Sequence, residues 1–240
     1  MHRILFLFLF YDVAFLKILL NTIYVKYCAI TMIILAVESL VMKKMFLIVC
    51  WISLVNISFA QTDTATLNDI NRFQKELIDE YKNETTSPLS KKAKKEFKGI
   101  HFFPVDMQYV VTAKFVRTAN EKIFAMPTSG NVTKQYVKFG EATFTMQDKE
   151  YKLNIYQSID LASQRKYRDY IFIPFRDATS GKETYGGGRY IDLTIPHGDT
   201  IVINFNKAYH PYCAYTEGFN CPVPPRENYL PIKIEVGVKF

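Results

Sequence analysis

The chain has 240 residues, of which 49% are hydrophobic and 15% aromatic, and its formal net charge is +7. This length favours one folded domain together with a targeting segment. Residues 1–60 are almost continuously apolar and hold five basic and two acidic residues, so the rest of the chain carries only about +4. So mild a charge gives no argument for nucleic acid as a partner, and the Lys91–Lys95 cluster is explained as the solvated face of a helix.

Met42 begins a segment with the organisation of a secretory signal peptide. Lys43 and Lys44 precede an apolar run, and Ala60 is a small residue directly before Gln61. A short positive region, an apolar core and a small residue at the cleavage position are typical of such signals. We therefore predict a signal peptide over residues 42–60 and an exported protein, either periplasmic or secreted.

The neighbouring residues are interpreted from this prediction. We interpret residues 1–41 as an upstream mis-start of translation or an apolar extension. Residues 61–65 are interpreted as the flexible start of the mature chain. The alternative is an uncleaved membrane anchor across residues 13–37 or 45–60. We expect the protein to contact a membrane only if this N-terminal segment stays uncleaved.

Two short helices are predicted at the start of a single domain over residues 66–240. The first begins at Thr66, with Asp69 in a weak capping box, and carries an apolar stripe at helical spacing. The stripe comprises Leu67, Ile70, Phe73, Leu77, Ile78 and Tyr81. Ser90 can cap a second helix that Gly99 ends. Packing of the stripe against the domain is the expected role.

From His101 onward the apolar pattern alternates with a period of two, which is typical of strands. Hairpin-like turns are expected at Asp148-Lys149 and His197-Gly198-Asp199. The candidate strands cover residues 108–117, 121–126, 132–139, 141–147, 150–157, 168–175, 189–194, 199–205 and 230–238. Short strands without intervening helices predict a mainly β (α+β) fold, either an antiparallel β-sandwich or a partly open barrel.

The segment before residue 190 contains three successive glycines, Gly186, Gly187 and Gly188, followed by Arg189. Consecutive glycine N–H groups can converge on an anion, and Arg176 and Arg189 could add bidentate contacts. The surrounding sequence fits neither a P-loop nor a dinucleotide-binding fingerprint. A tight turn or bulge before a strand explains the same glycines, and both interpretations stay open.

Cys213 and Cys221 lie eight residues apart in a proline-rich segment. In an exported protein the default expectation is a disulfide. The alternative is a zinc site with His210, the two cysteines and His197, although the Cys-x7-Cys spacing is unusual for zinc. We expect the disulfide, no metal and no cofactor.

Catalytic residues are not identifiable from the sequence. Cys213 with His210 or His197 could act as a nucleophile and base only if no disulfide forms. Paired acids, such as Asp192 with Glu183 or Glu227, could perform general acid–base chemistry, but their spacing is not specific. Whether the protein is an enzyme is left undecided.

Two long motifs identify a family resemblance. The strings FRDATSGKETYGGGRY and NFNKAYHPYCAY, followed by CPVPPRENYLP, resemble the bacterial domain of unknown function 1684 family over about residues 66–238. The family carries no activity that could be transferred. This chain has His210 where the family usually has Asn, which weakens zinc binding there, and Asn204 where Asp is more usual.

The leading hypothesis is that a small polar or anionic molecule binds between loops 176–190 and 206–228. Donors and aromatic rings concentrate in these two irregular segments of an otherwise regular chain. The predicted ligand-binding residues are Arg176, Ser180, Glu183, Thr184, Tyr185, Gly186, Gly187, Gly188, Arg189, Asn206, Tyr209 and Asn228. The alternatives are a hydrolase that uses an acid pair or a metal, and a structural envelope module without a ligand.

Overall fold

The computed structural model describes residues 42–45 and 64–240. The chain divides into two units, Met1–Thr62 and Asp63–Phe240. Most of the predicted signal peptide, the predicted extension over residues 1–41 and the anchor alternatives lie outside the described residues, as does the start of the 61–65 segment. Among the residues that are described, no helix is long and apolar enough to cross a membrane.

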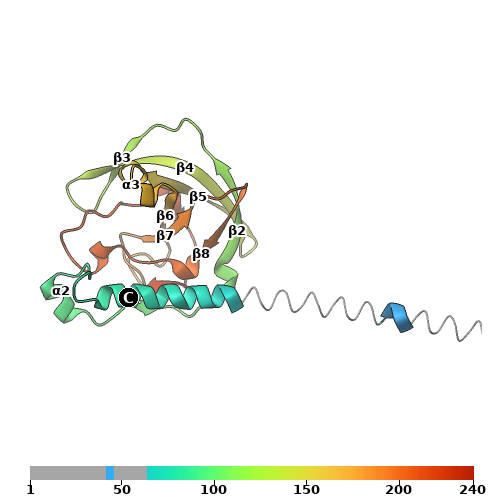
Figure 1. Ribbon diagram of the computed structural model, residues 1–240, viewed down its shortest axis with the longest axis horizontal. Helices are drawn as coiled ribbons and strands as arrows, with labels where there is room; N and C mark the ends of the chain where they lie inside the picture. The colour runs from blue at the N-terminus through green and yellow to red at the C-terminus, as the bar shows by residue number, and fades with distance from the viewer. Residues whose placement is uncertain (1–41, 46–63) are drawn as a thin grey trace, which may run out of the picture. The chain divides into compact units, whose positions relative to one another are not determined.

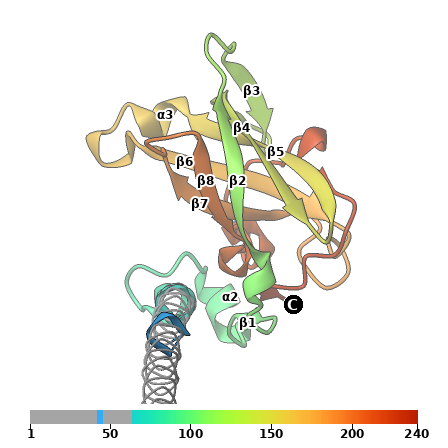
Figure 2. The ribbon, with the colours of Figure 1, turned by 90° about the vertical axis from the view of Figure 1, so that its right-hand side faces the viewer.

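The folded unit begins with a long helix. Residues 64–82 are helical, and Ile70 and Tyr81 are buried on the domain. The apolar stripe is therefore confirmed as a packing face, except at Leu67, which is 40% exposed. The prediction of a short first helix is wrong. In both ribbon views this helix (teal) lies at one end of the curled sheet, close to α2 (Figures 1 and 2).

Helix α2, Lys91–Glu96, follows the prediction closely. Ser90 is its N-cap, and the Ser90 hydroxyl accepts a hydrogen bond from the Ala93 N–H at 3.1 Å. The helix ends at Glu96, three residues before Gly99. The remaining helical turns are α3, Ile159–Ala162, and 3-10 turns at Met107–Tyr109, Arg165–Tyr167, Phe205–Lys207, Tyr212–Ala214 and Arg226–Asn228.

An eight-stranded sheet curled into a half-barrel forms the body of the domain, and it is antiparallel except at its shortest strand (Figure 2). Its main path runs β7-β6-β5-β4-β2-β8, while β3 pairs with β4 and β9 pairs parallel to β6. The strands are β2 Val110–Arg117, β3 Phe124–Pro127, β4 Thr133–Met146, β5 Lys149–Ser158, β6 Tyr170–Asp177, β7 Arg189–Thr194, β8 Thr200–Asn204 and β9 Tyr229–Leu230. The prediction of a mainly β, partly open barrel is confirmed.

The predicted strands 132–139 and 141–147 form one strand, β4. Its pairing with β5 shifts register at a bulge between Lys138 and Gly140, but the strand continues past it. A side chain at Gly140 would lie 2.5 Å from the Phe115 ring, so glycine allows β2 to approach closely at this point. The following hairpin turns through Gln147 and Asp148, one residue earlier than the predicted Asp148-Lys149 turn, because Lys149 already belongs to β5. Both residues have positive φ, as two-residue hairpin loops require.

Two further predictions are wrong. The turn after His197 does not join paired strands, because β7 and β8 lie at opposite ends of the sheet path. The predicted strand 230–238 is reduced to β9 and to β10, Val238–Lys239, which pairs with β1, His101–Phe102. Between them the chain is irregular, and Gly237 has a φ of 75°.

The two faces of the sheet are packed by different residue types. One face is aliphatic and phenylalanine-rich, and Phe205, Leu230, Ile234 and Val236 from the chain's last third fill it. The opposite face carries a tyrosine-rich cluster of Met126, Tyr136, Tyr156, Phe172 and Tyr190, with Tyr170 and Tyr209 against it. Side chains alternate between these faces along each strand. The tyrosine-rich face is where the 206–228 segment meets the sheet.

Candidate functional site

The glycine run forms a tight turn before β7. Gly188 has a φ of 92°, and a Cβ there would lie 2.5 Å from the Phe175 carbonyl oxygen, so only glycine fits. Its N–H donates to the Tyr185 carbonyl at 2.9 Å. The structural role of Gly188 is therefore clear. An anion contact by the N–H groups of Gly186 and Gly187 stays a prediction.

Arg189 is fully buried beneath this turn. Its guanidinium donates to the carbonyls of Val236 at 2.6 Å and Ile234 at 2.7 Å, and it pairs with Asp177 at 3.4 Å. Burial lowers the pKa of Arg189, an effect that the Asp177 carboxylate opposes. The side chain thus fastens the irregular C-terminal segment, and this geometry favours a structural role over the predicted anion contact.

Asp177 gathers several of the predicted residues around itself. Its carboxylate accepts hydrogen bonds from the Thr179 hydroxyl at 2.9 Å, the Ser180 hydroxyl at 3.3 Å and the Ile234 N–H at 2.7 Å. The Thr184 hydroxyl lies 2.9 Å from that of Thr179. This buried carboxylate was absent from the predicted site, although the Phe-Arg-Asp string of the first motif contains it.

Asn206 and Asn228 are both fully buried and bind backbone. Asn206 Oδ1 accepts from the Asp106 N–H, and its Nδ2 donates to the Asp106 carbonyl, both at 2.9 Å. Asn228 lies between β5 and β6, where it contacts Asn154 and Pro174. Each amide side chain replaces a missing backbone partner, as buried N–H and C=O groups require.

Glu183, Tyr185 and Arg176 lie closer to the surface. Glu183 pairs with Lys233 at 2.5 Å, and the hydrogen bond from Lys233 lowers the Glu183 pKa. Tyr185 packs against His210, with ring centroids 6.3 Å apart. Arg176 is half-buried, and its Nε has no hydrogen-bond partner. Glu183 Oε2 also has no hydrogen-bond partner, so both Arg176 and Glu183 keep unsatisfied hydrogen-bonding capacity.

His210 is held as a neutral ring. Its Nε2 accepts from the Tyr185 N–H at 3.1 Å, so Nδ1 carries the hydrogen and faces the Tyr215 hydroxyl at 3.1 Å. The ring lies 4.6 Å from that of Phe240. Burial lowers the His210 pKa to about 3. Both ring nitrogens have partners, which leaves neither free for zinc.

This burial predicts acid sensitivity. The folded pKa of His210 lies below its unfolded value of about 6.5, so the unfolded state binds more protons as the pH falls. The stabilising contribution is present above pH 6.5 and is lost as the pH falls towards 3. Between pH 7 and pH 5 the wild type should lose roughly 2 kcal/mol of unfolding free energy relative to His210→Asn. Urea titrations at both pH values measure this difference.

The control is Asn131→Ala, at an exposed position, which removes no titratable group and should keep the pH dependence of the wild type. Equal pH slopes for wild type and His210→Asn would contradict the prediction.

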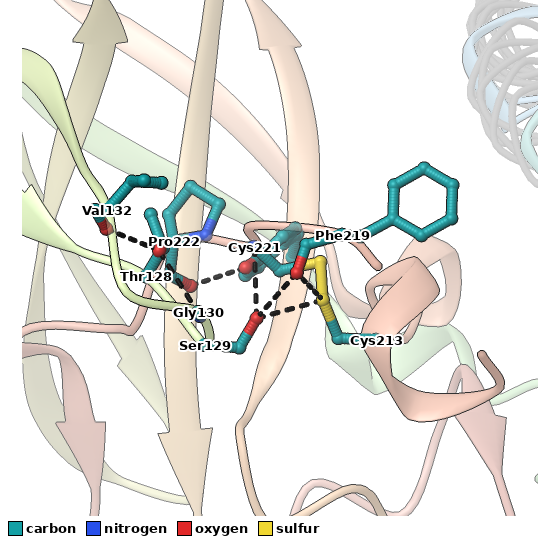
Figure 3. The surroundings of a disulfide bond; sticks show 9 residues. Thr128, Ser129, Gly130, Val132, Cys213, Phe219, Cys221 and Pro222 are labelled. Carbon is teal, nitrogen blue, oxygen red and sulfur yellow. Dashed lines mark hydrogen bonds between the residues drawn. A yellow bond between two sulfur atoms is a disulfide. The ribbon is translucent and has the colours of Figure 1, made fainter. Parts of the chain in front are cut away.

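The structure contains the predicted disulfide between Cys213 and Cys221, with Cα atoms 6.4 Å apart. The cross-linked loop contacts the turn between β3 and β4 (Figure 3). The Ser129 N–H donates to the Cys221 carbonyl at 2.8 Å, and the Ser129 hydroxyl accepts from the Cys221 N–H at 3.1 Å. A side chain at Gly130 would collide with Asn220. The disulfide loop is thereby fixed to the hairpin.

Replacing both cysteines with serine should lower the unfolding free energy by about 2.5 kcal/mol, because the unfolded chain gains the entropy of an open loop. Urea denaturation measures this loss. Reductant should destabilise the wild type by a similar amount and leave the double variant unchanged. If the unreduced, denatured wild type has two more titratable thiols than the double variant, the bond does not form; Cys28 and Cys50 contribute equally to both.

The disulfide loop forms one wall of a cavity of about 270 Å³, here called the ring cavity. It is lined by Lys134, Tyr190, Tyr209, Pro211, Tyr212, Phe219, Asn220, Cys221 and Pro222. The three tyrosine hydroxyls all have partners within the protein: that of Tyr190 donates to the Pro222 carbonyl, that of Tyr209 to Asp192 and that of Tyr212 to Glu80. The rings therefore offer mainly carbon to the cavity, and Lys134 is its only charged lining residue.

Asp192 lines a second cavity, of about 420 Å³, beside β7 and β8. It is also hydrogen-bonded to Tyr209, which lines the ring cavity. The hydroxyls of Tyr170 and Tyr209 both donate to its Oδ1 at 2.8 Å. The residue keeps an exposed edge, but the protein around the carboxyl desolvates it and raises its pKa, against the effect of both hydrogen bonds. Neither acid considered as its partner, Glu183 or Glu227, lines this second cavity.

The predicted ligand-binding residues do not converge on one cavity. Tyr209 lines the ring cavity, whereas Ser180, Thr184 and Arg189 surround Asp177. Sequence reasoning missed Lys134, because its strand carries no motif and its approach to the disulfide loop depends on the hairpin's fold. In the described ranges, no group of three or more His, Cys, Asp or Glu side chains could hold a metal ion.

Comparisons with known proteins place these motifs in one family. The chain is similar to the solution NMR structure of an uncharacterized protein of Haloarcula marismortui, with 26% identity, a TM-score of 0.60 and coverage of 75% of this chain and 97% of that one. No curated protein matches the chain. Residues 95–239 match the model of a protein family of unknown function, DUF1684. The chain therefore belongs to the DUF1684 family.

Proposed function

We propose that this β-rich domain is an exported binding protein whose ligand occupies the ring cavity. The ligand is a small molecule with a flat or aliphatic ring and one anionic group. The observation that carries this proposal is the composition of the cavity wall, in which the carbon of four aromatic rings surrounds a hollow with one cation at Lys134. Cavities with apolar walls and a few polar groups are typical of small-molecule sites.

The ring cavity lies within the region that the sequence indicated. Tyr190 closes the 176–190 segment, and most of the remaining lining residues belong to 206–228. The N–H and carbonyl groups of Tyr190 and Tyr209 exchange hydrogen bonds at 2.9 and 3.0 Å, which fixes these two rings together. Packing between Tyr212 and Phe219, with centroids 5.0 Å apart, orders the opposite wall. Such preorganisation lowers the entropic cost of binding.

Benzoate and its neutral analogue benzyl alcohol are the probes that test this proposal. We expect both to give saturation-transfer NMR signals with the protein, and benzoate to bind more tightly. Lys134→Met should weaken benzoate binding up to about fivefold and leave benzyl alcohol unchanged. Phe219→Ala should weaken both probes by about 1 kcal/mol.

Lys122→Met is the matched control, because Lys122 is exposed just before β3 and does not line the cavity. Absence of binding by both probes, or equal binding in all variants, would contradict the proposal. Native mass spectrometry of the protein purified from its own host would also identify any retained ligand. A hydrolase that uses an acid pair or metal, and a structural module, remain the alternatives; neither predicts the difference between the two probes.

A further inference from the structure

Residues 82–98 concentrate positive charge at one end of the domain. Six lysines and two glutamates occur in these 17 positions, which gives a net charge of +4. The segment comprises the end of the long helix, a short loop and α2. The charge of the folded unit is therefore unevenly distributed, although its total is small.

Most of these lysines are not neutralised by the protein. Lys94 has a structural role, because its Nζ donates to the carbonyls of Asn83 at 2.9 Å and Glu84 at 3.1 Å, at the end of the preceding helix. Five others are exposed and have no carboxylate within 4.0 Å among the described residues: Lys82, Lys91, Lys92, Lys95 and Lys98. We call these five residues the lysine surface.

The lysine surface borders a hollow of about 550 Å³, and Lys82 and Lys98 are among the residues that line it. The rings of Tyr81 and Phe97 also line it and are stacked, with centroids 5.5 Å apart. Tyr215 contacts both rings edge-on, at 5.1 and 5.9 Å. This packing fixes the helix end and α2 to the disulfide-bonded segment, so the lysines project from an ordered base.

We propose that the lysine surface binds the phosphate headgroups of an anionic phospholipid membrane. Basic clusters of four to eight residues are attracted to anionic lipid surfaces, and each lysine contributes roughly fivefold in affinity. The proposal is independent of the ring cavity, since the hollow shares no lining residue with it. It also needs no membrane-spanning segment, and so gives the domain a peripheral mode of attachment.

The character of the lysine surface favours a membrane over other sources of phosphate. A site for one free phosphate normally uses converging donors, often an arginine fork, whereas these side chains are exposed and spread over two elements. Single-stranded nucleic acid is bound partly by stacking on free aromatic rings. Here the rings of Tyr81 and Phe97 already stack on each other and contact Tyr215. A membrane presents many negatively charged headgroups over a wide area, which matches lysines that are spread over a surface.

Vesicle co-sedimentation of the whole protein tests the proposal. We expect binding to phosphatidylglycerol–phosphatidylcholine vesicles, with loss of most of it at 0.5 M NaCl through screening. Lys91→Ala/Lys95→Ala/Lys98→Ala should weaken binding about 100-fold. The control Lys114→Ala/Lys122→Ala/Lys149→Ala removes the same charge from exposed positions elsewhere. Any apolar N-terminal segment is identical in both variants, so it cannot produce a difference between them.

The other outcomes are distinguishable and overturn the proposal. If the two triple variants bind vesicles equally, the protein's net charge, and not the lysine surface, causes the attraction. If the wild type binds pure phosphatidylcholine vesicles as tightly as anionic ones, insertion of apolar residues causes the binding. Displacement from vesicles by 10-fold less inorganic phosphate than chloride would indicate a site for free phosphate. Tighter, salt-sensitive binding to single-stranded DNA than to vesicles would indicate nucleic acid.

Discussion

Replacing Arg189 with methionine is expected to lower the unfolding free energy by about 3–5 kcal/mol, the cost of breaking a buried ion pair by removing one partner. The variant would leave the Asp177 carboxylate buried without its cation. It would also leave the carbonyls of Ile234 and Val236 without the guanidinium that now bonds them. Urea denaturation monitored by circular dichroism measures the loss.

Two further variants separate this effect from a general loss of positive charge. Arg226→Met removes an exposed arginine and should change stability by less than about 0.5 kcal/mol. Asp177→Asn combined with Arg189→Met should be less damaging than the sum of the single changes, because no unpaired charge remains buried. A loss below 1 kcal/mol for Arg189→Met would contradict the structural role. Loss of anion binding at unchanged stability would instead support the ligand contact predicted from the sequence.

Arg189 also explains why one predicted strand does not form. Residues 230–238 alternate like a strand, and Ile234, Val236 and Val238 are indeed buried while Lys233 and Glu235 are exposed. The alternation predicted burial correctly. It could not predict that the carbonyls of the buried residues bond to a guanidinium in place of a neighbouring strand. Side-chain periodicity reports which face is buried and carries no information on the partner of the backbone.

The local elements were predictable where a local interaction determines them. Ser90 caps α2 through its own hydroxyl, and the turn between β4 and β5 lies within one residue of its predicted position. The single strand β4 is defined instead by its long-range pairing with β2 and β5 on both of its edges. Strand β8 pairs with β2 and not with β7, which precedes it in the sequence. Such long-range choices leave no local signal.

The candidate site divides in the same way. The disulfide was predictable because its two cysteines and the expected compartment suffice for the argument. The ring cavity depends on how the β3–β4 hairpin meets the disulfide loop, through Ser129 and Cys221. Motif density led to the predicted site, but many of the polar residues in these motifs bind the protein's own backbone. A dense motif can therefore indicate a demanding fold as readily as a ligand.

Asn228 shows this most directly, and Asn228→Ala is expected to lower the unfolding free energy by about 3 kcal/mol or more. Strands β5 and β6 pair at a single position, Tyr156 with Phe172, and then separate. The Asn228 side chain lies in the gap: Oδ1 accepts from the Asn154 N–H, and Nδ2 donates to the carbonyls of Asn154 and Pro174, each at 2.8 Å. Truncation leaves three buried backbone groups without partners, each costing about 1–3 kcal/mol, although such losses are not additive.

Asn228→Asp tests the donors separately. The introduced carboxylate can still accept from Asn154, but it cannot donate to the two carbonyls, and its burial raises its pKa. A folded pKa above the unfolded value of about 3.9 means that the variant's deficit grows as the pH rises from 4 to 7. Asn131→Ala, at an exposed position near the tip of the hairpin, is the control and should leave stability within about 0.5 kcal/mol. If the loss of unfolding free energy in Asn228→Asp does not depend on pH, the Asn228 amide does not bridge the strands. The motif that contains Asn228 would then be explained by binding and not by folding.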